Sequence, residues 1–402
     1  MGNWQARWYD AGGERQSATK PTRKEALAEK DKAKGELATG AYVDRKRGDI
    51  IVAQLWKERL EGRTILGTTA VRVDSNWRTH VQPRWGKTTF TALINEHQEI
   101  QNWVTGLTTK KNLSPETVWS VFNVLDQLCA AAVRGRRMMA NPCDGIVLPK
   151  ALIKHPDERQ PPSEEQLEEI CCHIPQTHYR RIVQLDRETG MRWEEISAIP
   201  PECINLDAGE LTVKWVIEEI NGRRIPREYP KSDAGLRTLP LTTKAVRIIR
   251  EQYAEMPPVP GQPIFRGPRG GLLGRHNFRN RVWLPATIAA GVHRESKRPN
   301  GRIEHWPTFH MIRHRFGSRL ENAGVSRATL REVLGHKSPK GDVTERYMHG
   351  AQERRQLILR ALGDVREPMP EVSRSSAHER KLVRRKAVRS SPSHPHASIR
   401  VA

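Results

Sequence analysis

Five prolines between residues 142 and 162 divide this chain into two parts, because no helix or strand can continue through such a stretch. They are Pro142, Pro149, Pro156, Pro161 and Pro162. Proline has no backbone N–H and a fixed φ angle, so a stretch this rich in it disfavours regular structure. Directly afterwards, Ser163 and Gln166 have the spacing of a capping box, which predicts that a new helix begins there. We therefore expect a linker over 149–162 between separately folded domains.

Before the linker, two patterns follow one another. Residues 4–10 alternate like a short strand, 11–13 read as a turn, and 15–19 can pair back. Thr22 and Glu25 then have capping-box spacing at the start of a helix that extends to Leu37. From Ile51 to Val147 the apolar residues recur at helical spacing. The sequence thus predicts a sheet-plus-helix module over 1–48 and an all-α domain of four or five helices over 50–148.

After the linker, helices and strands are mixed. Residues 210–217 read as one strand and 227–241 as a hairpin with its turn at 232–235. Helical patterns cover 244–255, 308–322 and 326–334. We expect a mixed α+β domain over 163–365, in a multidomain protein that is mainly α with small β-sheets. The last residues, 366–402, are poor in apolar side chains and predict a basic disordered tail.

The charge balance indicates the class of partner. The 402 residues include 68 Lys and Arg against 46 Asp and Glu, a net charge of +22, which concentrates polyanions around the protein. Nucleic acid is the leading candidate and an anionic membrane surface the rival. A transmembrane role is excluded, since the mean hydropathy is −0.68 and no run is long enough to span a bilayer.

Two further features bear on compartment and metal content. The start of the chain lacks the apolar stretch of a secretory signal, and Gly2 is not followed by the residues of a myristoylation site, so we expect the protein in the cytoplasm. The five cysteines are odd in number and contain no C-x-x-C pair. The sequence therefore predicts neither a disulfide framework nor a structural zinc site, and no metal ligands.

Two segments after the linker place single cations in suggestive positions. Gly190 followed by a helical pattern would project Arg192 from a helix start, and Glu195 lies on the same face, where it can orient the guanidinium. Taken alone, an ordinary surface Arg/Glu pair is the better interpretation. Lys231 is expected at the hairpin turn, where it could reach a phosphate. A lysine on a turn is, however, ordinarily a solvated residue.

A third segment opens the helix expected over 308–322. His310 and Arg313 are three residues apart and so share one helical face, which would direct an imidazole and a guanidinium into one site. His314 follows directly. The helical zinc-protease pattern needs Glu after its first His, and Met311 stands there instead. A catalytic zinc site is therefore not predicted.

Two more segments follow shortly. Gly335 can end the preceding helix with a positive φ, which leaves His336 just beyond it. Tyr347 lies in a charged stretch and would by itself be read as a half-buried surface residue. His310 and Tyr347 are nevertheless only 37 residues apart.

Taken together, the order Arg, Lys, His-x-x-Arg, Leu-Gly-His, Tyr resembles the signature of the tyrosine recombinases, and the chain resembles a phage-type integrase of that family. The resemblance implies that 1–48 is an arm-site DNA-binding domain, with a three-stranded sheet and a helix. It implies that 50–148 is a helical core-binding (SAM-like) domain and 163–365 the catalytic domain. One departure is the 11-residue step from His336 to Tyr347, longer than is common in the family.

The resemblance also implies a chemistry. Two guanidiniums would clamp the non-bridging phosphate oxygens, with an imidazole as a third donor, so that no metal, cofactor or ATP is needed. A tyrosine, with a pKa of about 10, would attack phosphorus and form a 3′-phosphotyrosyl link with help from a base and a general acid. The implied residues are Arg192 and Arg313 (clamp), His336 (donor), Tyr347 (nucleophile), His310 (base) and Lys231 (acid), with Glu195 and His314 in support.

The implied partners are double-stranded DNA attachment sites, a homotetramer at synapsis, a host DNA-bending protein and an excisionase, in the cytoplasm of a bacterial host. The function would be to integrate and excise a phage or other mobile element. Two alternatives stay open: a catalytically inactive DNA-binding regulator, and a type IB topoisomerase or resolvase-like enzyme. The N-terminal module argues against the second, and the filled catalytic positions argue against the first.

Overall fold

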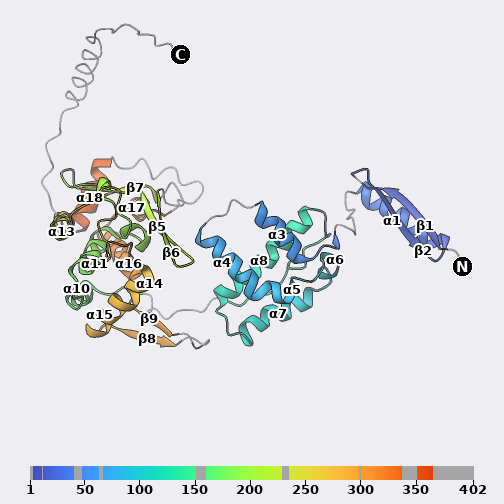
Figure 1. Cartoon of the computed structure of the whole chain (residues 1–402), viewed down its shortest axis with the longest axis horizontal. Helices are drawn as coiled ribbons and strands as arrows, with labels where there is room; N and C mark the ends of the chain where they lie inside the picture. The colour runs from blue at the N-terminus through green and yellow to red at the C-terminus, as the bar shows by residue number, and fades with distance from the viewer. Residues whose placement is uncertain are drawn as a thin grey trace, which may run out of the picture.

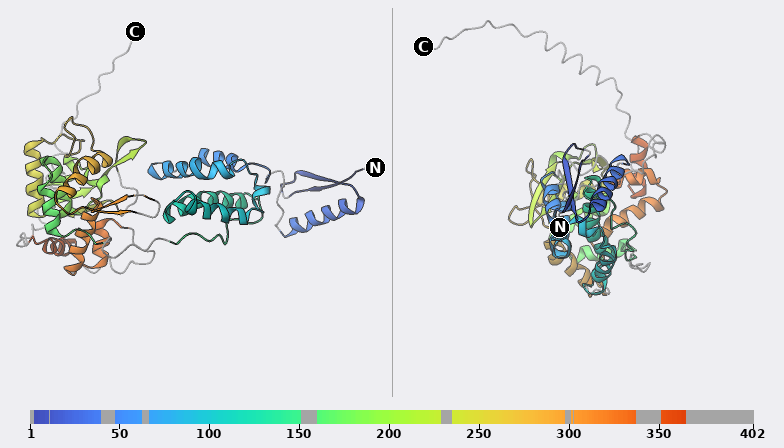
Figure 2. Two further views of the ribbon diagram at one scale, coloured as in Figure 1. Left: turned by 90° about the horizontal axis from the view of Figure 1, so that it is seen from below. Right: turned by 90° about the vertical axis from the view of Figure 1, so that its right-hand side faces the viewer.

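The computed structural model describes residues 3–10, 12–39, 48–62, 67–150, 160–228, 235–297, 301, 303–336 and 351–364. Three units follow one another along the longest axis of the molecule (Figures 1 and 2). The N-terminal unit lies at one end, a helical unit in the middle, and a third unit with both helices and strands at the other end. Within the described residues, none of the helices combines the length and apolar character that crossing a bilayer requires.

The N-terminal unit is a hairpin packed on a helix. Strands β1 (Trp4–Tyr9) and β2 (Arg15–Lys20) pair antiparallel, and helix α1 (Arg23–Ala38) lies against both. The Thr22 side chain accepts a hydrogen bond from the Glu25 N–H, which is one of the two hydrogen bonds of the predicted capping box. The expected three-stranded sheet is wrong for the described residues, because α1 begins three residues after β2 and the sheet has two strands. Residues 40–47 lie outside the described part.

The helical unit is built from helices of very unequal length. They are α3 (Val52–Glu61), α4 (Thr68–Asn76), the π-helical turn η1 (Trp77–Val81), α5 (Gln82–Trp85), α6 (Phe90–Leu93), α7 (His97–Thr109) and α8 (Pro115–Arg134). Helices α4, η1 and α5 follow one another without a break in the chain. Trp77 of η1 stacks on Trp56 of α3, with ring centroids 4.7 Å apart, inside a shared apolar core. The predicted helical character of this stretch is confirmed.

The third unit has a core of helices. They are α10 (Glu164–Cys172), α11 (Thr177–Thr189), α12 (Trp193–Ile196), the 3-10 turn η2 (Pro201–Cys203), α13 (Thr243–Glu255), α14 (Arg275–Phe278), the π-helical turn η4 (Arg279–Trp283), α15 (Leu284–Ala289), α16 (His310–Asn322), α17 (Arg327–Leu334) and α18 (Ala351–Ala361). Helix α11 packs between α13 and α16. The capping box at Ser163 is formed, and the three helices predicted after residue 243 are present.

The strands of this unit form small antiparallel sheets. Strands β3 (Ile204–Asn205), β4 (Glu210–Val213) and β7 (Arg237–Pro240) make one, β5 (Trp215–Ile220) and β6 (Arg223–Glu228) a second, and β8 (Arg294–Lys297) and β9 (Ile303–Trp306) a third.

Two strand predictions are wrong. The stretch 210–217 is not one strand, because β4 and β5 belong to different sheets. The hairpin expected over 227–241 does not form either: β6 pairs with β5, and β7 pairs with β4. The physical reason is the turn at Asn221 and Gly222, whose φ values of 50° and 76° suit a two-residue hairpin and join β5 to β6.

Candidate active site

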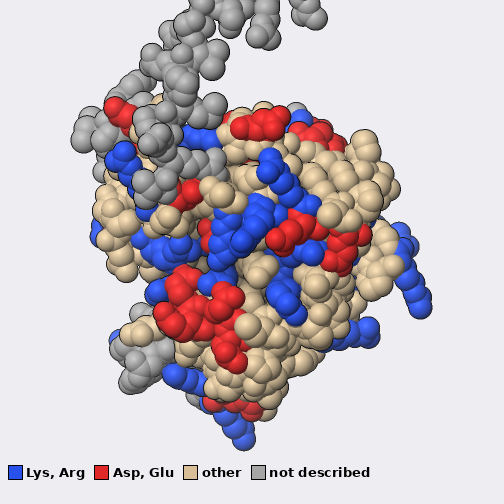
Figure 3. Space-filling view, turned by 90° about the vertical axis from the view of Figure 1, so that its left-hand side faces the viewer, with Lys and Arg blue, Asp and Glu red and all other residues tan. Residues whose placement is uncertain are grey.

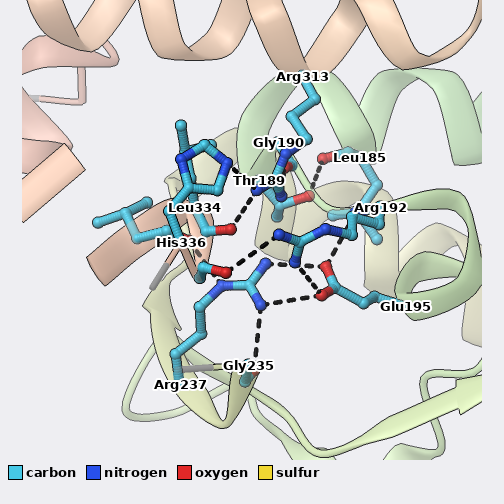
Figure 4. A network of polar contacts seen from close by, with 12 residues as sticks. Leu185, Thr189, Gly190, Arg192, Glu195, Gly235, Arg237, Arg313, Leu334 and His336 are labelled. Carbon is cyan, nitrogen blue, oxygen red and sulfur yellow. Dashed lines mark hydrogen bonds and ion pairs between the residues drawn. The ribbon is translucent and has the colours of Figure 1, made fainter. Parts of the chain in front are cut away.

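Four chain segments of the third unit meet at a cluster of arginines (Figure 4). The α11–α12 turn brings Arg192, strand β7 brings Arg237, helix α16 brings Arg313, and the end of α17 brings His336. The two turns depend on glycine. Gly190 ends α11 and Gly335 ends α17, both in the left-handed region with φ of 57° and 61°. The expected end of α17 at Gly335 is confirmed.

Glu195 holds two of these arginines. Its Oε1 accepts from Arg192 Nη1 at 2.8 Å and from Arg237 Nη1 at 3.1 Å, while its Oε2 accepts from Arg237 Nη2 at 2.9 Å and from the Arg192 backbone N–H at 2.9 Å. Burial alone would raise the pKa of this carboxyl, but the hydrogen bonds and charges of Arg237 and Arg192 together outweigh it and lower the pKa to about 2. Glu195 therefore stays a carboxylate at neutral pH. The predicted pairing with Arg192 is present and is not a surface pair.

The sequence prediction missed Arg237. Besides its two bonds to Glu195, it donates through Nε to the Val333 carbonyl at 2.6 Å and through Nη1 to the Gly235 carbonyl at 3.1 Å. The side chain is almost fully buried. The sequence held one weak indication of this role. Arg237 and Leu239 are two residues apart and both face inward along β7, and an arginine is rarely buried without a partner.

Arg313 is anchored through backbone carbonyls. Its Nη1 donates to the Gly190 carbonyl at 2.8 Å, and its Nη2 donates to the Leu334 carbonyl. A Cβ at Gly190 would overlap the Phe316 ring, so only glycine lets this turn approach α16 closely enough. Burial, and then the nearby Arg192, lower the pKa of Arg313 to about 10, which leaves it protonated at neutral pH.

The cluster also includes His336. Its Nε2 lies 3.2 Å from Arg313 Nη2, close enough to accept a hydrogen bond from the guanidinium. Burial and the charge of Arg313 lower the pKa of His336. Arg192 reaches the same corner, because its Nη2 donates to the Gly335 carbonyl at 3.0 Å. Three of the predicted site residues, Arg192, Arg313 and His336, therefore lie together.

His310 stands at the edge of the cluster. It lines a pocket of about 440 Å³ with Arg192, Arg275 and Arg279. Burial, followed by the neighbouring His314 and Arg313, lowers the pKa of His310 to about 4, so its imidazole is neutral at pH 7. The His314 ring lies edge-on to it at 5.0 Å between centroids. A neutral imidazole can accept a proton, as the sequence interpretation requires of this residue. The neighbouring guanidiniums make it a weaker base than a free histidine.

Sequence reasoning also missed Asp186, on the last turns of α11. It is fully buried near Arg313 and Glu195, and burial raises its pKa well above the usual range. The two acids of the cluster thus differ: Glu195 is charged, and Asp186 favours the neutral form. An aspartate in a helix pattern offers no sequence signal of such burial.

Two predicted site residues, Lys231 and Tyr347, lie outside the described residues, as do the turn at 232–234 and the tail 366–402.

Comparison with known proteins places this cluster in a family. Residues 163–354 match the model of the phage integrase family. This span contains every predicted catalytic position. The chain carries a phage integrase domain.

Curated relatives of this integrase domain are tyrosine recombinases, a family that breaks and rejoins DNA. The "Tyrosine recombinase XerC-like" of Caldanaerobacter subterraneus subsp. tengcongensis is 22% identical over 339 residues, which cover 79% of this chain and 83% of the relative. The "Tyrosine recombinase XerC" of Ralstonia pickettii is 27% identical over 221 residues, covering 52% of this chain and 61% of the relative.

Solved integrases share the fold. The Tn1549 transposon integrase in complex with transposon right end DNA has a TM-score of 0.60 at 18% identity, covering 78% of this chain and all of that one. A lambda integrase dimer bound to a COC′ core site has a TM-score of 0.53 at 16% identity, covering 91% and 95%. The predicted fold class is thus supported at the level of a multidomain integrase that is mostly helical with small sheets.

The arginines of the integrase domain differ in how accessible they are to a ligand. Arg237 is buried and bonded to Glu195 and two carbonyls, so it serves as a support. The Arg192 side chain is 33% exposed, and among the described residues its Nε and one hydrogen on each terminal nitrogen have no hydrogen-bond acceptor. These forked donors suit the oxygens of a phosphate.

Proposed function

We propose that this protein is a site-specific tyrosine recombinase that cuts and rejoins DNA to integrate and excise a phage or mobile element. The observation that carries the proposal is the convergence of Arg192, Arg313 and His336, fixed by Glu195 and by backbone carbonyls. Oriented cations and imidazoles of this kind stabilise the extra negative charge that develops on phosphate oxygens during attack at phosphorus.

The proposed step conserves the number of phosphate ester bonds. The Tyr347 phenolic oxygen attacks the phosphorus, a P–O bond to tyrosine forms, and the P–O5′ bond breaks. The phenolic proton passes to His310, whose imidazole is neutral at pH 7. Lys231 gives a proton to the leaving 5′ oxygen. The 3′-phosphotyrosyl product retains the energy of the broken bond, so the reverse attack by a 5′ hydroxyl rejoins DNA.

The other units would supply binding. We assign 1–48 to arm-site DNA, 50–148 to core-site DNA and 163–365 to catalysis. One solved relative is a lambda integrase tetramer bound to a Holliday junction, which supports a homotetramer at synapsis for this chain as well. A host DNA-bending protein and an excisionase complete the proposed partners.

The decisive test is covalent trapping. The full-length protein is incubated with a nicked suicide duplex bearing the junction sequences of the element that encodes it, without ATP and without added metal. We expect a DNA adduct that peptide mapping assigns to Tyr347. Tyr347→Phe should bind the duplex with unchanged affinity and form no adduct, whereas Tyr253→Phe, which removes a hydroxyl elsewhere in the domain, should form it normally.

The outcomes separate the alternatives. Tight binding of a verified site without any adduct indicates an inactive DNA-binding regulator. An adduct with relaxation of supercoiled DNA, but without strand exchange between two sites, indicates a topoisomerase. An adduct that persists in Tyr347→Phe refutes the assignment of the nucleophile.

A further inference from the structure

Three potential metal ligands meet at the base of the β8–β9 hairpin. Glu295 of β8 lies directly opposite His305 of β9 in the antiparallel register. His293 precedes Glu295 by two residues and so projects to the same face. The two imidazoles and the carboxylate thereby come together across the two strands.

The distances between the ligand atoms are those of a tetrahedral metal site. His293 Nε2, His305 Nδ1 and Glu295 Oε1 are each 3.4 Å from the other two. In a regular tetrahedron the edge is about 1.63 times the distance from centre to corner, so edges of 3.4 Å correspond to metal–ligand bonds of about 2.1 Å, as found for Zn²⁺ with imidazole and carboxylate ligands.

We propose that His293, Glu295 and His305 bind one Zn²⁺ ion per chain and leave its fourth position to water. Two histidines and one glutamate are an established ligand set for this ion. The proposal goes beyond the recombinase function, whose proposed steps involve no metal.

Hydrogen bonds fix the backbone on both sides of the three ligands. The His293 N–H donates to the Thr287 carbonyl at 3.1 Å, which fixes β8 to the end of α15. Trp283 Nε1 donates to the Pro307 carbonyl at 2.7 Å, which fixes the chain just beyond β9. Among the described residues, however, the buried His293 Nδ1 has no hydrogen-bond partner. Such a partner usually strengthens a histidine ligand, so we expect affinity below that of four-ligand structural sites.

The position of the site suggests what the ion does. His305 also lines the pocket that contains Arg192 and His310. A metal bound between the strands would tie the two strands to each other, and through His305 it would stabilise one wall of this pocket. The proposed role of the ion is therefore to stabilise the hairpin beside the active site.

Zinc binding is measured on untagged full-length protein after chelator treatment, by titration of Zn²⁺ in competition with a chromogenic chelator. Histidines at 378, 394 and 396 can add weak sites, so the informative quantity is the difference between variants. We expect His305→Ala to lose one Zn²⁺ per chain, and Glu295→Gln to weaken that site at least tenfold. His173→Ala is the matched control, because His173 and Glu169 form a two-ligand pair at the same 3.4 Å.

A second readout reports geometry. Co²⁺ substituted into the wild-type protein should give the intense visible absorption of a tetrahedral site, and His305→Ala should not. Zn²⁺ should also raise the melting temperature of the wild type and of His173→Ala, but not of His305→Ala. Equal zinc stoichiometry in the wild type and in a folded His305→Ala protein overturns the proposal. Because binding is measured directly, failure of the proposed recombination leaves this result unaffected.

Discussion

Two buried acids of the same cluster have opposite protonation preferences, and this difference is testable. Glu195→Gln removes a charge that two arginines share, so we expect a loss of about 3 kcal/mol or more in the free energy of unfolding. Asp186→Asn replaces a group that already favours its neutral form, so the change should stay within about 1 kcal/mol. Urea denaturation at pH 7 measures both. Equal losses would contradict the assigned charges.

Glu195 also predicts how the stability of the protein changes in acid. The pKa of Glu195 is lowered to about 2 in the folded protein. Its stabilisation is therefore complete above the ordinary glutamate pKa of about 4.3 and disappears as the pH falls through 2. The difference in the free energy of unfolding between the wild type and Glu195→Gln should therefore become smaller as the pH falls over this range.

His310 predicts that the stability of the protein also depends on pH in a higher range. Its pKa is lowered to about 4, whereas an unfolded histidine titrates at about 6.5. Between these values the unfolded chain takes up the proton and the folded chain does not, so stability falls as the pH drops from about 6.5 to 4. His310→Gln lacks this titration. Its urea midpoint should decline less steeply than that of the wild type over this range, and parallel declines would refute the lowered pKa.

At the scale of elements, the contact between the α11 turn and α16 determines where Arg313 lies. Gly190→Ala would place a methyl group in the Phe316 ring at a positive φ. We expect a loss of about 2–4 kcal/mol in stability, and loss of DNA cleavage because the Gly190 carbonyl that holds Arg313 moves.

Gly324→Ala is the matched control for this prediction. Its φ is +78°, but nothing lies within 4 Å of the added Cβ. It should lose only about 1 kcal/mol, with cleavage retained. Thermal unfolding and the suicide-duplex assay are the measurements. A cleavage rate in Gly190→Ala equal to that in Gly324→Ala would show that the close approach does not matter.

At the scale of the whole molecule, the charge is large but unevenly distributed. Figure 3 shows the end of the molecule that the third unit forms, where Lys and Arg side chains alternate with Asp and Glu. Pairs in this unit such as Arg181 with Glu255 and Arg187 with Glu164 neutralise one another. Part of the positive charge of this unit is therefore balanced by neighbouring carboxylates.

The net charge predicts DNA binding that depends steeply on salt. If the protein contacts six or more phosphates, its affinity for duplex DNA should fall about 1,000-fold between 50 and 200 mM salt, because bound counterions are released on binding. Fluorescence anisotropy of a labelled duplex measures the slope. An affinity that changes less than threefold over this range would contradict a binding surface made mainly of phosphate contacts.

The parts of the fold that the sequence predicted correctly rest on short-range interactions. The helix starts at Thr22 and Ser163 depend on a side chain and a backbone N–H three residues away. The link from Arg192 to Glu195 spans one helical turn, and the end of α17 needs only the freedom of Gly335. The Asn-Gly turn at 221–222 was an equally local signal that the interpretation of the strands overlooked.

What the sequence alone determined is therefore where several helices begin and end and which residues form the signature, since both can be read from neighbours along the chain. Only the tertiary structure decided that Arg237 supports Glu195 from 42 residues away, that Asp186 is buried in the same cluster, and that His305 meets Glu295 across a hairpin. These contacts depend on which strands pair and which helices pack. Pairing and packing are decided by burial of the whole core, which no short stretch of sequence specifies.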